Sequence, residues 1–284
     1  MSVSVIMVSY RTGPVLFDAI DAVLDAPDVD ELVVVNHDNP PADEARLTAL
    51  AAAEDSVKLV NTRANLGFSR GCNIGAKAST GDYLLFLNPD AMLSPGVAAR
   101  LVKTHGGLVE PAIVGALIVE ADGSEQPGSR RGELSVRAAI QSFLGGPGYR
   151  RDHEPMPRDA VPMETISGAA LLMSRSGFEA LGGFDEGYFL HVEDIDLCKR
   201  ARSAGGQIMF EPRAAVRHIG STSAASRLKI ERHKAAGLVR YFSRHSGPLG
   251  PLKAALAAPV IYTAVYARAM RRFASSRSDA RKDA

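Results

Sequence analysis

The first part of the chain alternates short apolar runs with stretches whose apolar residues recur every three or four positions. Continuous apolar runs are typical of strands that helices cover on both faces. Four such strands are predicted at residues 3–10, 31–36, 57–60 and 84–87. The stretches between them predict helices, from residue 15 to 23 and up to about residue 53. This order predicts an α/β fold with a doubly wound, mostly parallel sheet flanked by helices.

Beyond residue 90 the pattern is less regular. Strands are predicted at residues 112–119, 168–173 and 207–210. A helix is predicted at residues 193–204. Residues 124–160 are rich in Gly, Pro and Arg and show little periodicity, which is typical of a functional or mobile loop. From residue 226 the pattern is helical, with a break at 246–248, so we expect a helical C-terminal appendage.

Composition places the chain among ordinary globular proteins, since 46% of its residues are hydrophobic and 23% are charged. Its two cysteines, Cys72 and Cys198, are too few for a disulfide framework, which favours a reducing compartment. The N-terminus lacks a basic leader region, so we expect no signal peptide. No apolar run approaches the roughly 20 residues that a membrane-spanning helix needs. Together these features predict a cytoplasmic protein.

The net charge of +1 hides an asymmetry along the chain. Residues 227–284 hold 13 Lys and Arg against 3 Asp and Glu, a net charge of +10. The first 226 residues hold 20 against 29, a net charge of −9. A basic tail on an acidic body is typical of proteins whose tail meets an anionic lipid surface or nucleic acid. The tail lacks interleaved aromatic residues, so we expect no nucleic-acid partner.

The apolar run of the fourth strand ends abruptly in Asn88, Pro89 and Asp90. In open α/β sheets, ligands bind at the carboxyl ends of the strands. A carboxylate held there by a rigid strand can bind a divalent cation, and the cation can bind a phosphate. Asp90 is therefore a candidate metal ligand.

A Gly- and Asn-rich stretch, NLGFSRGCNIG, runs from Asn65 to Gly75 between the third strand and a helix. Glycines let backbone approach a ligand closely, and a helix N-terminus favours anions. The spacing is not that of a dinucleotide fingerprint. The stretch is equally compatible with a plain strand-to-helix loop.

Three carboxylates lie within four residues at Glu193, Asp194 and Asp196. Acidic residues in a first helical turn are stabilised by the helix dipole, which is the simplest explanation. Their density is unusual, because three such groups repel one another unless a cation, a proton or a polar ligand relieves them. Neighbours on a helix point about 100° apart, so one carboxylate could act as a base while the other orients a substrate.

His218 follows a predicted strand and precedes Gly220 and Ser221. A lone histidine is more often a hydrogen-bonded structural residue than a ligand. In a chain that also carries Asp90, an imidazole and a carboxylate together suit Mn²⁺ or Mg²⁺ bound to a diphosphate.

These features together resemble a family 2 inverting glycosyltransferase with the GT-A fold. The chain is most similar to the bacterial cell-envelope rhamnosyltransferase branch, over about residues 3–222. The resemblance rests on six segments in the family's order: VSY at residues 8–10, NLGFSRGCNIGA, YLLFLNPD, SGAALLMSR, GGFDEGYFLHVEDIDLCKR and RHIGSTS.

The resemblance implies a role for each matching residue. Asp194 would be the catalytic base, Asp90 the last residue of the metal-binding D-x-D motif, and His218 a further ligand of Mg²⁺ or Mn²⁺. The acceptor side would include Glu193 and Gly168. The nucleotide-sugar side would include Ser9, Tyr10, Asn36, Asn65, Asn73 and Asn88.

The resemblance also implies the partners. A nucleotide-diphosphate sugar, with rhamnose as the sugar that the branch suggests, would be the donor. A saccharide or polyprenyl-linked molecule would be the acceptor. Residues 1–225 would form the catalytic domain. Residues 226–284 would form a basic helical extension, and the protein would lie at the inner face of the cytoplasmic membrane.

Two features leave alternatives open. Many family members have an Asp after the second strand, where this chain has Asn36, followed by His37 and Asp38. The D-x-D motif also lacks its first Asp, since Asn88 stands there. Both departures are compatible with a non-catalytic membrane scaffold. A sugar-phosphate nucleotidyltransferase is less compatible, because no Gly-rich, Arg-containing phosphate loop follows the first strand. The apolar segment 251–266 either lies on a membrane surface or packs on the catalytic domain.

Overall fold

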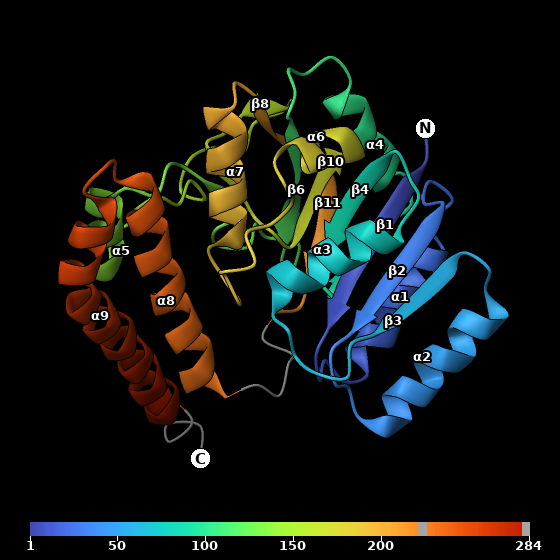
Figure 1. The fold of residues 1–284 in the computed structure, drawn as a ribbon, viewed down its shortest axis with the longest axis horizontal. Helices are drawn as coiled ribbons and strands as arrows, with labels where there is room; N and C mark the ends of the chain where they lie inside the picture. Colours follow the sequence, from blue (N-terminus) through green and yellow to red (C-terminus); the bar gives the residue numbers. More distant parts are fainter. Residues whose placement is uncertain (221–225, 280–284) are drawn as a thin grey trace.

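The computed structural model describes residues 1–220 and 226–279 (Figure 1). Within them a nine-stranded sheet has the order β3-β2-β1-β4-β10-β6-β11-β5, and β8 pairs with β11. The strands of this sheet are β1 Val3–Ser9, β2 Glu31–Asn36, β3 Val57–Asn61, β4 Tyr83–Leu87, β5 Ala91–Met92, β6 Ile113–Val119, β8 Val161–Pro162, β10 Ala170–Ser174 and β11 Ile208–His218. A small second sheet pairs β7 Arg130–Arg131 with β9 Thr165–Ile166.

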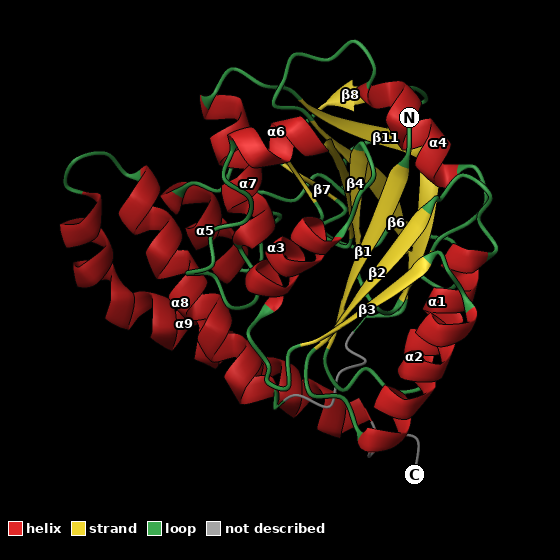
Figure 2. Cartoon of the chain, turned by 45° about the vertical axis from the view of Figure 1, so that its right-hand side comes forward, coloured by secondary structure: helices red, strands yellow, loops and turns green. Residues whose placement is uncertain are grey.

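Helices cover both faces of the main sheet, with α1 and α2 on one side and α3 on the other (Figure 2). The helices are α1 Val15–Leu24, α2 Pro41–Ala53, α3 Phe68–Ala78, α4 Val97–His105, α5 Val136–Phe143, α6 Arg175–Ala180, α7 Glu193–Ser203, α8 Arg227–His245 and α9 Gly250–Asp279. Every residue of β1 and β2 is buried. The sheet therefore separates two apolar cores, as its continuous apolar strands predict.

The first four strands confirm the predicted parallel arrangement, because β1 pairs in parallel with β2 and β4, and β2 with β3. The sheet as a whole is mixed, since β10 runs antiparallel between β4 and β6. In this register Ala170 at the start of β10 faces Leu87 at the end of β4. The carboxyl end of β4 therefore meets the segment that leads into β10.

Two predicted boundaries are wrong. The strand expected at 207–210 is β11, which continues to His218 past an irregular register between Glu211 and Ala215. The continuation was not predicted because of Pro212, since a proline cannot donate a backbone hydrogen bond to a neighbouring strand. The aperiodic stretch 124–160 also contains a helix, α5, whose first turn is capped by Ser135 Oγ accepting from the amide of Ala138.

The C-terminal part consists of α8 and α9, which lie side by side, with α5 against them (Figure 1). The predicted break at 246–248 separates the two helices, and α9 continues through Pro259. No helix in the described ranges is both long enough and apolar enough to cross a bilayer. The predicted domain boundary at residue 225 falls outside the described residues, and so do Ser221 and the basic residues Arg281 and Lys282.

Candidate active site

Asp90 and His218 lie together at the carboxyl edge of the sheet. The Oδ1 atom of Asp90 is 3.0 Å from Nε2 of His218, and both side chains are largely buried. Strand pairing sets this contact, because His218 ends β11 opposite Ala91 in β5. The amide nitrogen Nδ2 of Asn88 also lies 3.1 Å from His218 Nε2. Two residues 128 positions apart in the chain are thus brought together by the sheet.

The hydrogen bonds of His218 orient its ring toward Asp90. Its Nδ1 lies 2.8 Å from Oε1 of Gln126, and Gln126 Nε2 donates to the backbone carbonyl of His218 (3.3 Å). With Gln126 Oε1 accepting from Nδ1–H, the lone pair of Nε2 faces Asp90 and Asn88. An outer hydrogen bond of this kind fixes the orientation of metal-ligating histidines.

The pair fits a divalent cation that shares its remaining ligands with a diphosphate and water. Mg²⁺ and Mn²⁺ are commonly held by one or two protein side chains plus substrate phosphates. A carboxylate oxygen and an imidazole nitrogen 3.0 Å apart are suitably placed to bind one cation together. Within the described residues, no cluster of three or more His, Cys, Asp or Glu side chains forms a complete protein cage.

Asp194 lies in the first turn of α7 with both oxygens engaged. Its Oδ2 accepts from Arg131 Nη2 and from the Gly168 amide, each at 2.9 Å, and its Oδ1 accepts from the Ile195 amide at 2.8 Å. A side chain at position 168 would press on Asp194, since a Cβ there would lie 3.1 Å from the Asp194 Cβ. Gly168 therefore lets the backbone hold this carboxylate closely.

Glu193 precedes Asp194 and has a different environment. It is 6% exposed, and its Oε2 has no hydrogen-bond partner. Burial, reinforced by the negative charge of Asp194, raises the pKa of Glu193 to about 8. Glu193 is therefore protonated at neutral pH, whereas Asp194 is paired with a guanidinium. Neighbouring carboxyl groups in such contrasting environments suit different roles.

The two parts of the site are joined by short segments. The backbone N–H of Asn88 donates to the carbonyl of Ala169. The backbone N–H of the adjacent Gly168 donates to the Asp194 carboxylate. Gln126, which contacts His218, also lines the cleft that contains Glu193 and Asp194. The candidate metal pair and the acidic turn of α7 therefore meet across one edge of the sheet.

Backbone strain concentrates at this edge. Five non-glycine residues in the described part of the chain have positive φ. Three of them follow β1, β2 and β3, and two precede α7; they are Arg11, Asp38, Arg63, His191 and Val192. Such conformations cost of order 1–3 kcal/mol each and cluster at functional sites. Val192 at φ 76° is the most unusual, because its branched side chain disfavours this conformation.

The predicted nucleotide side forms a polar network at the ends of β1 and β2. Ser9 Oγ accepts from Asn39 Nδ2 (2.9 Å), and the Asn39 amide group also donates to Asn36 Oδ1 (2.7 Å). Asn36 in turn donates to Asn61 Oδ1 (2.7 Å). Both Ser9 and Asn36 are buried, and Tyr10, beside them, is half-buried. Their role as nucleotide contacts stays a prediction.

The asparagines of the 65–75 stretch have structural partners. Asn65 Oδ1 accepts from the Gly67 amide (3.0 Å), just before α3. Asn73 is bonded twice to the backbone of Phe184, donating to its carbonyl and accepting from its amide, each at 2.9 Å. It thereby ties α3 to the loop before α7. Contact of Asn65 and Asn73 with a nucleotide sugar also stays a prediction.

Comparison with known proteins identifies the family. The family model for glycosyl transferase family 2 matches residues 4–179. The chain belongs to this family. The predicted family and enzyme class are therefore confirmed, and the protein is a glycosyltransferase.

The similar curated proteins include rhamnosyltransferases. The N-acetylglucosaminyl-diphospho-decaprenol L-rhamnosyltransferase of Mycobacterium tuberculosis (strain CDC 1551 / Oshkosh) is 30% identical over 265 residues, which cover 86% of this chain and 85% of the relative. The rhamnosyltransferase WbbL of Escherichia coli (strain K12) is 29% identical, over 46% of this chain and 50% of its own length.

Solved structures confirm the GT-A fold. GalNAc-T7 with UDP, GalNAc and Mn²⁺ has a TM-score of 0.63 at 16% identity, and the match covers 92% of this chain and 55% of GalNAc-T7. The mannosyltransferase PcManGT from Pyrobaculum calidifontis, with GDP-Man and Mn²⁺, has a TM-score of 0.59 at 17% identity, with 93% and 73% covered.

Sequence reasoning missed two residues of this glycosyltransferase site, Gln126 and Arg131. Both lie in the aperiodic stretch 124–160, where no strand or helix pattern fixes the direction of a side chain. The adjacent pair Arg130–Arg131 in a Gly-rich segment was the available signal. Arg131 contacts Asp194, whereas Arg130 pairs with Glu125 through two bonds of 2.8 and 2.7 Å.

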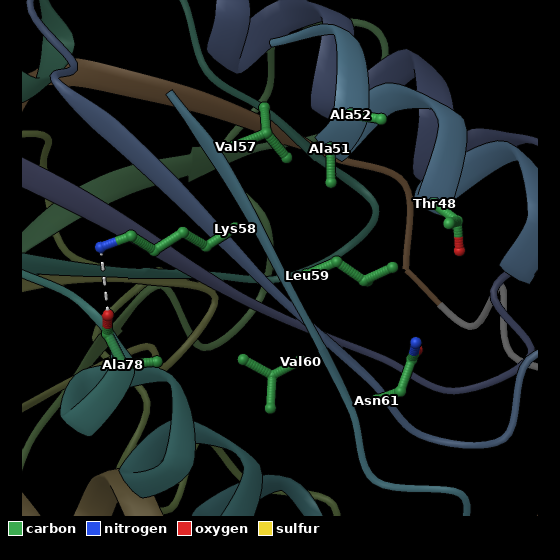
Figure 3. Close-up of a pocket in the computed structure, with 9 residues that line it drawn as sticks. All are labelled: Thr48, Ala51, Ala52, Val57, Lys58, Leu59, Val60, Asn61 and Ala78. Atoms are coloured by element: carbon green, nitrogen blue, oxygen red, sulfur yellow. Dashed lines mark hydrogen bonds between the residues drawn. The ribbon is translucent and has the colours of Figure 1, made fainter. Parts of the chain in front are cut away.

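A separate hollow of about 590 Å³ lies beside the edge strand β3, next to α2 (Figure 3). Its charged side chain, Lys58, donates to the Ala78 carbonyl at 3.4 Å and pairs with Glu31 at 2.5 Å. No carboxylate or imidazole of the described structure lines this hollow. Among its described residues the hollow therefore offers no candidate base or metal ligand, and the edge that carries Asp90, His218 and Asp194 stays the candidate site.

Proposed function

We propose that this glycosyltransferase is an inverting enzyme that moves a sugar from a nucleotide-diphosphate sugar to a lipid-linked saccharide. Rhamnose is the first sugar to test, because the tuberculosis relative that matches most of this chain is a rhamnosyltransferase. The observation that carries the proposal is the junction of the Asp90–His218 pair with the Asp194 turn through Gln126 and Gly168.

On the donor side, Asp90 and His218 would hold Mg²⁺ or Mn²⁺, with Asn88 beside them. The cation would neutralise the charge that grows on the leaving diphosphate as the glycosidic bond breaks. The half-buried Tyr10 and the loop that carries Asn65 flank the nucleotide. Ser9 and Asn36 act through their hydrogen-bond network, which fixes the ends of β1 and β2.

On the acceptor side, Asp194 takes the proton from the acceptor hydroxyl as its oxygen attacks the anomeric carbon. Arg131 and the Gly168 amide hold Asp194 in place, and Oδ1 keeps one lone pair for the proton. Attack from the face opposite the diphosphate inverts the stereochemistry in one displacement. No covalent sugar–enzyme intermediate is needed.

Glu193 orients the acceptor rather than deprotonating it. A carboxyl group with a pKa of about 8 carries a proton at neutral pH and donates a hydrogen bond. Glu193 lines the same cleft as Asp194. Its Oε2 is buried and unpartnered, so it gains a hydrogen-bond partner only when the acceptor binds.

The cellular setting follows from the acceptor. The name of the tuberculosis relative specifies a diphospho-decaprenol acceptor. We propose that this enzyme also acts on a polyprenyl-linked acceptor, at the inner face of the cytoplasmic membrane, in the synthesis of a cell-envelope polysaccharide.

Release of nucleoside diphosphate from a panel of nucleotide sugars tests this function. We expect transfer to depend on Mn²⁺ or Mg²⁺ and to require a saccharide-diphosphate-lipid acceptor, with an inverted anomeric centre in the product by NMR. A protein that releases no diphosphate from any donor, with or without such acceptors, would instead be a scaffold with a transferase fold.

A further inference from the structure

A cleft of about 1140 Å³ extends from the candidate catalytic groups between α5, the start of α7, α8 and α9. We name it the α5–α9 cleft. Its lining includes Glu193 and Asp194 at the start of α7 and residues of both C-terminal helices. The elements that surround it are labelled in Figure 1. Its volume lies slightly above the roughly 300–1,000 Å³ of pockets for drug-sized ligands. The cleft therefore has room for more than the sugar that receives the transfer.

Much of the cleft wall is apolar. They include Leu134, Ile140, Leu238, Ala257, Ile261 and Ala264. This composition does not suit a second sugar, because hydroxyl groups would lose their hydrogen bonds to water there. It suits a hydrocarbon chain.

The cleft opens onto an exposed apolar surface. Val136 and Ile140, one turn apart on α5, are 59% and 54% exposed. On α9, Leu252, Leu256 and Val260 follow one another at four-residue spacing and are 58%, 74% and 70% exposed. Val136, Ile140 and Val260 also line the cleft. A continuous apolar path thus leads from the outer surface to the acidic turn of α7.

Basic groups stand along the same path. Arg150, Lys234 and Lys253 line the cleft, with Glu231 as the acidic residue among the C-terminal helices there. Of these, Arg150 also pairs with Asp152 at 3.7 Å. Basic groups near an apolar channel match a diphosphate joined to a hydrocarbon tail. Neither feature alone would specify this chemistry, but a prenyl diphosphate has both parts.

We propose that the α5–α9 cleft binds the isoprenoid chain of the acceptor, with the diphosphate at the basic groups and the sugar at Asp194. This inference rests on the proposed function for the identity of the acceptor, and it adds the place where the lipid is bound. The exposed surface of α5 and α9 is then the entrance by which the chain enters from a bilayer.

Direct binding tests the cleft without any sugar transfer. The probes are geranylgeranyl diphosphate and inorganic diphosphate, titrated calorimetrically into the full-length protein. We expect the prenyl probe to bind at least about tenfold more tightly than inorganic diphosphate. Equal affinities for the two probes would overturn the proposal.

Variants locate the binding. Ala257→Trp fills the cleft and should abolish the preference for the prenyl probe. Ala255→Trp, two residues away on the exposed side of α9, is the matched control and should keep it. Ile140→Asp provides a second variant at an exposed position, where misfolding is not expected, and should also weaken the preference. If Ala257→Trp and Ile140→Asp bind like the wild type, the chain does not lie in this cleft.

Transfer assays separate this proposal from the proposed function. With saccharide-diphosphate acceptors of short and long prenyl chains, Ala257→Trp should raise KM for the long acceptor about tenfold and leave the short one unchanged. Transfer without any chain-length preference in the wild type would overturn the cleft but keep the function. Tight prenyl binding without transfer to any acceptor would keep the cleft and overturn the function.

Discussion

Two adjacent carboxyl groups in the first turn of α7 show how local environment divides chemistry between like residues. Asp194 is paired with Arg131, whereas Glu193 is buried with an unpartnered oxygen. Sequence alone placed both at one site but could not show this difference, because it depends on Arg131, 63 positions away, and on the burial of Glu193.

Replacement of Glu193 by Gln should change how stability depends on pH. Folding raises the pKa of Glu193 from 4.5 to about 8, so the folded state binds more protons between these values. This contribution to stability is complete below pH 4.5 and is lost as pH rises toward 8, at up to about 1.4 kcal/mol per pH unit. Glu193→Gln should therefore gain stability relative to the wild type as pH rises.

Urea unfolding at several pH values over this range measures the effect. Glu179→Gln, at an exposed position on α6, is the control and should follow the wild-type curve. Parallel curves for Glu193→Gln and the wild type would show that Glu193 is ionised in the folded protein.

Arg131→Met should reduce transfer strongly in the folded protein. Without the guanidinium, Asp194 Oδ2 loses one of its two donors, so the carboxylate is less firmly positioned to act as the base. The loss of a buried ion-pair partner should also cost about 3–5 kcal/mol of stability. Rates are therefore compared per folded molecule, and an unchanged transfer rate would show that Arg131 has only a structural role.

Arg130→Met provides the contrast. Arg130 is 3% exposed and paired with Glu125, and its guanidinium also donates to the carbonyls of Glu154 and Pro155. Its loss should cost about 3–5 kcal/mol in a denaturant titration and leave the transfer rate per folded molecule unchanged. A reduced rate per folded molecule would place Arg130 in the chemistry.

At the level of elements, α8 is fastened to the loop before α7. Asp185, in that loop, pairs with Arg240 and Arg244 at 2.7 and 2.8 Å, and the ring of Phe189 stacks on His233 at 4.2 Å between centroids. Gly237 lets α8 approach the strained turn, since a Cβ there would lie 3.0 Å from the His191 carbonyl oxygen. The helix that extends the cleft therefore also supports the turn that carries Asp194.

Asp185→Asn should loosen this attachment. We expect faster hydrogen exchange in α8, while β1, buried in the sheet, keeps its protection. Transfer should fall in parallel, because α8 supports the turn before Asp194. Asp21→Asn, at an exposed position on α1, is the control. Unchanged exchange in α8 would mean that the helix is held mainly by its apolar contacts.

The elements that sequence predicted well are those that repeat one pattern over a full strand or helix. The four apolar strands are examples, because a strand buried on both faces must be apolar throughout. The end of β11 and the helix α5 could not be predicted. Pro212 interrupts the first, and α5 exposes Val136 and Ile140 that a helix on a core would bury. The pairing of β10 between β4 and β6 is a tertiary choice with no local signal.

For the whole molecule, the C-terminal helices complete the site. The predicted domain boundary at residue 225 stays untested. Leu238 and Phe242 of α8 pack with Leu134, Tyr188 and Val192 of the preceding part of the chain. A protein truncated after residue 225 would expose these residues. We expect it to unfold at lower temperature and to lose transfer to lipid-linked acceptors; an active, equally stable fragment would show an independent catalytic domain.

Sequence reasoning could bring some candidate site residues together because strand ends of one sheet converge. Asp90 follows β4 and His218 ends β11, so the fold itself brings them together. Residues supplied by loops, such as Gln126 and Arg131, had no such constraint. The roles of all these groups remain predictions.

The most direct test is Asp194→Asn, measured for both donor binding and sugar transfer with Mn²⁺ present. If Asp194 is the base beside a separate donor site at Asp90, donor affinity should stay within about threefold of the wild type while transfer falls by several orders of magnitude. Asp90→Ala should instead weaken metal-dependent donor binding itself. Near-normal transfer by a folded Asp194→Asn protein would contradict the proposed mechanism.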